Sequence, residues 1–170
     1  SLGRIFPTNL YRRLRDMGEK GIIAEAPGPV DGQRRVFRIT PFGKREGLSS
    51  DMTTGLWEGP DGSLWIGASA GGVDRLKDGR VSTISVRDGL PSDDVSALAG
   101  AGDGGLWIGT LSEGLARLEG GRVSRRFARG DLTGDGVRAL LEDRNGILWI
   151  GGNLGLTRLE GREATRLGVK

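Results

Sequence analysis

The heptapeptide DGSLWIG at residues 61–67 recurs as DGGLWIG at residues 103–109 and as NGILWIG at residues 145–151. Both intervals are 42 residues long, so every position of one copy has a counterpart in the next. Self-similarity at a fixed period of this length indicates a protein built from repeated structural units. The repeat therefore determines the expected architecture of most of the chain.

The similarity extends to both sides of the heptapeptide. A related pentapeptide precedes each copy: GLSSD at 47–51, GLPSD at 89–93 and DLTGD at 131–135. A related tetrapeptide follows each copy: VDRL at 73–76, LARL at 115–118 and LTRL at 156–159. The last of these arrives one residue early, which predicts a deletion in a turn between Gly151 and Leu156.

Each unit is expected to form four short strands. In the middle unit they are predicted at Val95–Ala99, Leu106–Gly109, Gly114–Leu118 and Arg122–Phe127. The Asp-Gly and Asn-Gly pairs between the first two strands favour tight hairpin turns, because these residues tolerate positive φ. The Leu-Trp-Ile-Gly strand is apolar on both faces, as expected for a strand between two layers. Four strands in about 40–45 residues are typical of a β-propeller blade.

Glycine content excludes the helical repeats. The chain has 32 glycines in 170 residues, against a usual ~7%, and each glycine costs ~1 kcal/mol inside a helix. Ankyrin and tetratricopeptide units are also shorter, at ~33–34 residues. A WD40 blade has a similar length, but its Trp-Asp and Gly-His marks are absent from this sequence.

The units resemble the two-component regulator propeller repeat, whose pattern runs GLPS, Asn or Asp, a Val two positions on, an Asp-Gly or Asn-Gly turn, LWIGT and GLxR. Residues 89–93, Val95, residues 103–110 and residues 114–117 carry the resemblance best. It covers residues 47–170 and implies part of a large extracytoplasmic sensor region, as in hybrid histidine kinases and related regulators.

The predicted fold is thus mainly β, with blades at about residues 47–88, 89–130 and 131–170. A propeller ring needs ~4–8 blades. We therefore expect further blades, from the same or another chain, to complete it. In each blade, Asp61, Asp103 and Asn145 are expected to form the turns, and Trp65, Trp107 and Trp149 to pack between blades. Trp57 breaks the repeat, because Ala99 and Leu141 occupy its place.

Residues 1–46 differ in charge from the repeats. They carry ten Lys and Arg against five Asp and Glu, whereas residues 47–170 carry fifteen against seventeen. The spacing of Leu10, Leu14 and Met17 predicts a short amphipathic helix. Strands are expected near Ile22–Glu25 and at Gln33–Thr40, which together give a small α+β unit with the layout of a partial winged helix.

This segment resembles the second half of a PadR-type transcriptional regulator domain. The resemblance is carried by LYRRL at residues 10–14, GII at 21–23 and GQRRVFRITPFG at 32–43. It implies DNA as a partner, contacted by Asn9, Tyr11, Arg12, Arg15, Arg34 and Arg35. Two alternatives remain open: a solvated basic face, or a last strand of a preceding blade at residues 35–47.

Composition excludes several chemistries. The sequence has no Cys and no His, which removes thiolate sites and the commonest general base. We therefore expect no catalytic residue, no metal and no cofactor, and we rank a propeller lyase or glycosidase last. The leading interpretation is a cytoplasmic regulator that binds DNA through residues 1–46 and an unidentified ligand or protein through its blades. The alternative is a fragment of a periplasmic sensor of a two-component system, without DNA binding.

Overall fold

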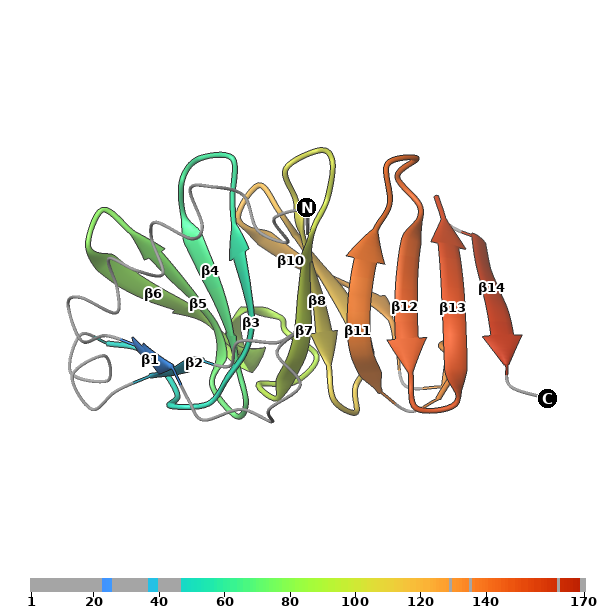
Figure 1. The fold of residues 1–170 in the computed structure, drawn as a ribbon, viewed down its shortest axis with the longest axis horizontal. Coiled ribbons are helices and arrows are strands. Elements are labelled where there is room, and N and C mark those ends of the chain that lie inside the picture. The colour runs from blue at the N-terminus through green and yellow to red at the C-terminus, as the bar shows by residue number, and fades with distance from the viewer. Residues whose placement is uncertain are drawn as a thin grey trace, which may run out of the picture.

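Three antiparallel sheets of four strands make up most of the part of the chain that the structure describes (Figure 1). The computed structural model describes residues 23–25, 37–39, 47–128, 130–134, 136–161 and 163–168. Each large sheet is a simple meander in which every strand pairs with the next one along the chain. Among the described residues, helix is limited to one turn of 3-10 helix, η1, at Val86–Asp88. The mainly β fold expected for residues 47–170 is confirmed.

Each of these sheets comes from one copy of the sequence repeat. Blade 1 contains β3 (Thr53–Glu58), β4 (Leu64–Ala68), β5 (Gly72–Lys77) and β6 (Arg80–Ile84). Blade 2 contains β7 (Val95–Gly100), β8 (Leu106–Thr110), β9 (Leu115–Glu119) and β10 (Arg122–Phe127). Blade 3 contains β11 (Val137–Glu142), β12 (Leu148–Gly152), β13 (Gly155–Glu160) and β14 (Glu163–Gly168). In the middle blade the predicted bounds are correct to within one residue.

The turns follow the sequence pattern. Gly62, Gly104 and Gly146 have φ of 76°, 86° and 76°, which explains why glycine follows Asp or Asn at these positions. The missing residue of blade 3 falls between β12 and β13. Only Asn153 and Leu154 connect these strands, whereas three residues, 69–71, connect the same strands of blade 1.

A β-bulge at the start of the first strand recurs in all three blades. The register shifts between Thr53 and Gly55, between Val95 and Ala97, and between Val137 and Ala139. A bulge adds one residue to one strand and changes which face the following side chains occupy. Periodicity alone did not predict it.

The hydrophobic cores lie between blades. One core joins blade 1 to blade 2 and includes Val73, Val95 and Ile108, with Trp57 and Leu98 packed against it. The other joins blade 2 to blade 3, and its members include Ala97, Trp107, Val137, Leu148 and Ile150. Each of these two cores therefore takes residues from two blades, which is the general reason that repeat units stabilise one another.

Glycine in the LWIG strand makes room for the neighbouring blade. A Cβ on Gly67 would lie 3.0 Å from Val95 Cγ1 and 3.2 Å from Leu98 Cγ. A Cβ on Gly109 would collide with Val137 of blade 3. The glycine is thus required because the first strand of the next blade lies against it.

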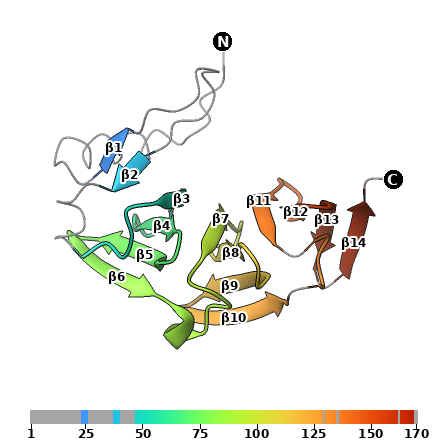
Figure 2. The same ribbon diagram turned by 90° about the horizontal axis from the view of Figure 1, so that it is seen from below.

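The blades fan out into an open arc with their first strands on the concave side and their fourth strands on the convex side (Figure 2). The face of blade 3 that points away from blade 2 is uncovered. Leu141 on this face is 63% exposed and Ala139 is exposed, whereas Ala97, at the same repeat position as Ala139, is 8% exposed. Blade packing, rather than residue type, therefore decides burial at this position.

In residues 1–46, the described part is one strand pair. β1 (Ile23–Glu25) pairs antiparallel with β2 (Phe37–Ile39), at the two places where strands were expected. The expected helix, including Leu10, Leu14 and Met17, lies outside the described residues. The same is true of Asn9, Tyr11, Arg12, Arg15, Arg34 and Arg35, so the predicted winged helix and its DNA contacts stay predictions.

Candidate ligand grooves between the blades

Two grooves open between neighbouring blades, where the turn after the first strand of one blade approaches that of the next. The first groove, between blades 1 and 2, has a volume of about 400 Å³. The second, between blades 2 and 3, has a volume of about 850 Å³. Both lie in the range of small-molecule sites, which are typically ~300–1,000 Å³. Each places tryptophan, arginine and carboxylate side chains around glycine-rich turns.

The blade 1 wall of the first groove is organised by Asp61. Its Oδ1 accepts a hydrogen bond from Ser63 N at 3.0 Å, and its Oδ2 accepts from Arg75 at 2.6 Å and Lys77 Nζ at 3.0 Å. The backbone hydrogen bond from Ser63, followed by that from Lys77, holds the pKa of Asp61 well below its ordinary value. Asp61 is therefore an anion at neutral pH that fixes two cations.

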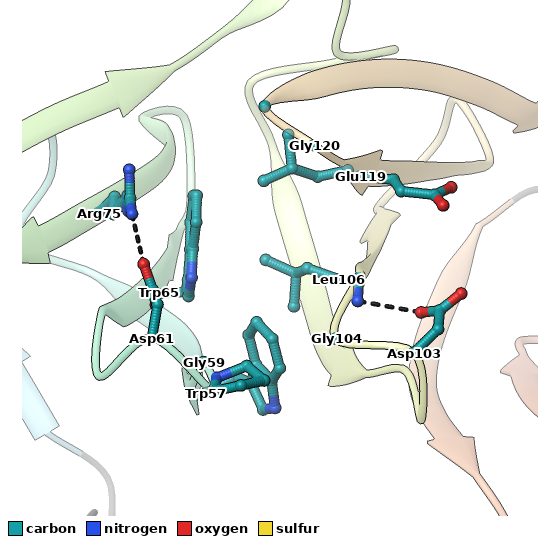
Figure 3. A pocket seen from close by; sticks show the side chains of 14 residues that line it. Trp57, Gly59, Asp61, Trp65, Arg75, Asp103, Gly104, Leu106, Glu119 and Gly120 are labelled. Carbon is teal, nitrogen blue, oxygen red and sulfur yellow. Dashed lines mark hydrogen bonds and ion pairs between the residues drawn. The ribbon is translucent and has the colours of Figure 1, made fainter.

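Trp65 stands between Arg75 and the groove (Figure 3). Arg75 Cζ lies 5.2 Å from the centre of the Trp65 ring, which is within the distance of a cation–π contact. Across the groove are Leu106 and Gly120 of blade 2, and Trp57 lies below. The space is thus a slot with an indole on one wall and apolar side chains on the other.

Trp57 packs into the junction between blades 1 and 2. A Cβ on Gly100 of blade 2 would collide with Trp57 Nε1, so glycine is required where the indole crosses the strand. Trp57 is half-buried and packs against the core of this junction. Trp57, which has no counterpart in the other two blades, therefore both packs the junction and forms one surface of the groove.

The second groove contains a carboxylate in place of that indole. Glu142 of blade 3 accepts hydrogen bonds from Gly102 N at 2.6 Å and from Trp107 Nε1 at 2.7 Å, both in blade 2. Arg117 Cζ lies 4.5 Å from the Trp107 ring and its guanidinium is paired with Asp103. Glu142 thus connects the two blades through one backbone and one indole donor.

In blade 3 the tryptophan is satisfied by its own blade. Trp149 Nε1 donates to Asp143 Oδ2 at 3.0 Å, while Asp143 Oδ1 accepts from Asn145 N and Ile147 N. The indole hydrogen bond, above all, lowers the pKa of Asp143. The capping carboxylate of this turn is therefore Asp143, two residues before the expected Asn145.

The remaining repeat residues lie as follows. Asp103 Oδ1 accepts from Gly105 N at 3.0 Å, so Asp61 and Asp103 occupy equivalent turn positions. Trp107 is 8% exposed, whereas Trp65 and Trp149 are half-buried. Sequence reasoning did not single out Arg75, Arg117 or Glu142 as groove residues. The first two repeat at an interval of 42, a signal that was available, but the contact of Glu142 spans 35 residues.

Within the stretches that the structure describes, no group of three or more Asp, Glu, His or Cys is placed to hold a metal ion. The same stretches contain no helix long and apolar enough to cross a membrane.

Comparison with known families adds an independent observation. Residues 89–112 and 131–153 match the model of the two component regulator propeller family. In blades 2 and 3, each matched segment begins in the loop before the first strand, which contains the buried Leu90 or Leu132, and ends just after the LWIG strand. The propeller part of the sequence resemblance is confirmed, and the match lies entirely outside residues 1–46. No curated protein matches the chain.

Solved structures share the fold. The extracellular domain of BT4673 from B. thetaiotaomicron, described as a hybrid two component system, superposes with a TM-score of 0.64 at 18% identity, covering 79% of this chain and 22% of that one. The corresponding domain of BT3049 gives 0.58 at 22% identity, covering 75% and 18%. Virginiamycin B lyase from Staphylococcus aureus gives 0.58 at 14% identity, covering 87% and 55%.

The chain thus spans about a fifth of the length of the B. thetaiotaomicron domains that it matches. Identities this low establish a common fold, and a fold is compatible with many functions. Sensor domains and a lyase share this fold, so the fold alone does not distinguish a sensor from an enzyme.

Proposed function

We propose that residues 47–170 are part of the extracytoplasmic sensor region of a two-component system, where the blades recognise a ligand or protein without catalysing a reaction. The observation that carries this proposal is the family match over residues 89–112 and 131–153. The extracellular B. thetaiotaomicron domains of the same fold support it. These findings favour the sensor interpretation over the DNA-binding one.

The electrostatics of the grooves support a recognition role. Asp61 and Asp143 accept several hydrogen bonds each, and their pKa values are lowered. A carboxyl group that acts as a general acid near neutral pH needs a raised pKa instead. Asp61, which lines the first groove, therefore suits a fixed structural anion better than the proton donor that lyase or glycosidase chemistry needs.

The test uses the full-length protein in its host cell. Protease added to intact cells should cleave within the blades, because the sensor region is expected outside the cytoplasmic membrane. Deletion of residues 47–170 should abolish ligand-dependent phosphorylation of the cognate regulator, whereas total protein and basal phosphorylation should persist. Protection of the blades until lysis would contradict the proposed location.

A DNA-binding assay separates the two regulatory interpretations. If the sensor proposal is correct, the chain should not bind duplex DNA even at low ionic strength. Binding that weakens steeply with salt, as phosphate contacts require, would favour the regulator interpretation instead.

A further inference from the structure

The repeated tryptophan has a carboxylate partner in two of the three blades. Trp107 Nε1 donates to Glu142, and Trp149 Nε1 donates to Asp143. The two acceptors come from adjacent positions, the last residue of a first strand and the residue after it. An indole N–H at the edge of a blade junction is thus paired with an anion that the chain itself supplies.

Neither of these carboxylates has a counterpart beside Trp65. Gly100 stands 42 residues before Glu142, and Gly59 stands 84 residues before Asp143. A Cβ on Gly59 would lie 3.1 Å from Asp61 Oδ1 and 3.2 Å from Trp65 Nε1, so the indole nitrogen borders the position where blade 3 has its aspartate, and blade 1 has Asp61 beside it. Among the described residues, no side chain accepts a hydrogen bond from the N–H of Trp65 or of Trp57.

The first groove occupies this location. Its lining includes Trp57, Gly59 and Trp65 of blade 1, and Leu106 and Leu118 of blade 2. The slot therefore combines an apolar wall with indole donors that no described side chain accepts from, which suits a ligand with one polar acceptor and an apolar body.

The charged side chains that line the groove are Arg75 and Asp61 on the blade 1 side, and Asp103 and Glu119 on the blade 2 side. Asp61 is paired with both Arg75 and Lys77, which leaves one positive charge in excess on the blade 1 side. On the blade 2 side, Asp103 and Glu119 share Arg117, so the negative excess is on the opposite wall. Within the groove, an anionic group is therefore better placed next to Trp65 and Arg75 than on the blade 2 wall.

We propose that the first groove binds a small organic carboxylate. Its carboxylate oxygen accepts from Trp65 Nε1, taking the place that Glu142 and Asp143 hold for the other two tryptophans, and its apolar body lies between the Trp65 ring and Leu106. The inference rests on the proposed recognition function and specifies the ligand class for one groove.

Nuclear magnetic resonance of the ¹⁵N-labelled chain tests this inference, because four tryptophans give four indole N–H signals. Phenylalanine substitutions assign the signals. Benzoate is expected to shift the Trp65 signal, and benzamide, which has the same ring and no charge, is expected to bind about tenfold more weakly or worse. Equal binding of both probes, or a shift confined to Trp107 or Trp149, would overturn the proposal.

A carboxylate built into the protein provides the matched variant. Gly59→Asp copies the arrangement of blade 3 and is expected to weaken benzoate binding about tenfold or more by occupying the Trp65 donor. Gly59→Ala adds the Cβ without the carboxylate and should keep most of the binding. Undiminished benzoate binding by a folded Gly59→Asp chain would contradict the assignment.

A double variant covers the case in which Gly59→Asp does not fold. Trp57→Ala with Gly100→Glu reproduces the second junction, where Ala99 and Glu142 stand at these positions. The double variant should remove benzoate binding and should shift the Trp65 indole signal even without ligand. Trp57→Ala alone adds no acceptor and should leave that signal near its original position. An unmoved Trp65 signal in the double variant would contradict the inferred equivalence of the two junctions.

These outcomes separate this inference from the broader proposal. If neutral compounds bind in the groove as well as benzoate does, the carboxylate assignment is wrong and a recognition role still holds. If the blades prove cytoplasmic and phosphorylation is independent of them, the sensor proposal is wrong, whatever benzoate does.

Discussion

At the scale of single residues, the three blades have different side chains at the two equivalent positions where the loop before the blade meets the third strand. Asp74 in β5 is fully buried and accepts hydrogen bonds from Ser49 N, Ser49 Oγ and Thr83 Oγ1. Blade 2 has Pro91 and Ala116 at the positions of Ser49 and Asp74, and blade 3 has Thr133 and Thr157, which bond to each other. In blades 1 and 3 the loop before the blade is thus held by a matched pair of hydrogen-bonding residues, and blade 2 has apolar residues at both positions.

The matched pair predicts a non-additive double substitution. Asp74→Ala leaves the Ser49 donors unpaired and should destabilise the chain by about 3 kcal/mol. Ser49→Pro combined with Asp74→Ala removes both the donor and the acceptor, as in blade 2, and should recover more than half of that loss. Urea denaturation measures both values, and simple additivity of the two substitutions would refute the pairing.

The lowered pKa values of Asp61 and Asp143 predict an acid-sensitive fold. A carboxylate whose folded pKa is below its unfolded value stabilises the fold at neutral pH, and this stabilisation is lost as the pH falls below the ordinary value of 3.8. Substitution of Asp61 by Asn should therefore lower the free energy of unfolding at pH 7 and flatten its decline between about pH 4 and pH 2.

Thermal melts across this pH range measure the effect. Asp78→Asn in the turn after β5 is the control. Asp78 is not part of the cluster that Asp61 forms with Arg75 and Lys77. An Asp61→Asn variant with an unchanged acid profile would show that the cluster does not stabilise the fold.

At the scale of elements, the junctions rather than the sheets distinguish the blades. Hydrogen-bonded pairing is nearly the same in all three sheets, down to the bulge in the first strand. The junctions differ: Trp57 crosses Gly100 in one, and Glu142 bonds Gly102 and Trp107 in the other. The end of the first strand thus makes an apolar contact at the junction of blades 1 and 2 and hydrogen bonds at the junction of blades 2 and 3.

Glu142 is expected to hold blades 2 and 3 together. Glu142→Ala leaves the Gly102 and Trp107 donors without their acceptor and should lower the free energy of unfolding by about 2 kcal/mol, whereas Glu142→Gln, which keeps one acceptor, should lose about 1 kcal/mol. Chemical denaturation followed by tryptophan fluorescence measures these values. Glu119→Gln is the control, because Glu119 is exposed, and an equal loss there would argue against a specific role for Glu142.

At the scale of the whole molecule, the cores between blades give the arc a direction. Each blade covers the LWIG strand of the one before it, through Val95 and Leu98 in one case and Val137 and Leu140 in the other. The last face of this series, with Ala139 and Leu141, has no blade on it in the chain described here. Burial at a given repeat position is therefore a property of the assembly.

Ala97 and Ala139 test this directly, because they share residue type and repeat position. Ala97→Lys places a charge in the core between blades 2 and 3 and should cost about 3 kcal/mol or more. Ala139→Lys should change the free energy of unfolding by less than about 0.5 kcal/mol. Urea denaturation at low protein concentration compares them, and an equally large loss at Ala139 would mean that this face is covered in solution.

Sequence reasoning succeeded where the physics is local. The turn at Asp103 and Gly104 needs one positive φ and one short side-chain bond, and the LWIG strand needs apolar residues on both faces, so residues a few positions apart predict both. The deletion in blade 3 was found for the same reason. Asp143, in contrast, replaces Asn145 as the capping side chain, and the repeat register gave no sign of that exchange.

The sequence by itself predicted four strands in each unit and their bounds in the middle blade, because a 42-residue period and its glycines restrict the backbone locally. Only the tertiary structure decided which tryptophan meets a carboxylate. Trp107 bonds Glu142 across 35 residues and Trp57 crosses Gly100 across 43, and such contacts depend on how blades pack. The first groove differs from the second for that physical reason: its junction supplies two indoles, and no described side chain accepts a hydrogen bond from either N–H.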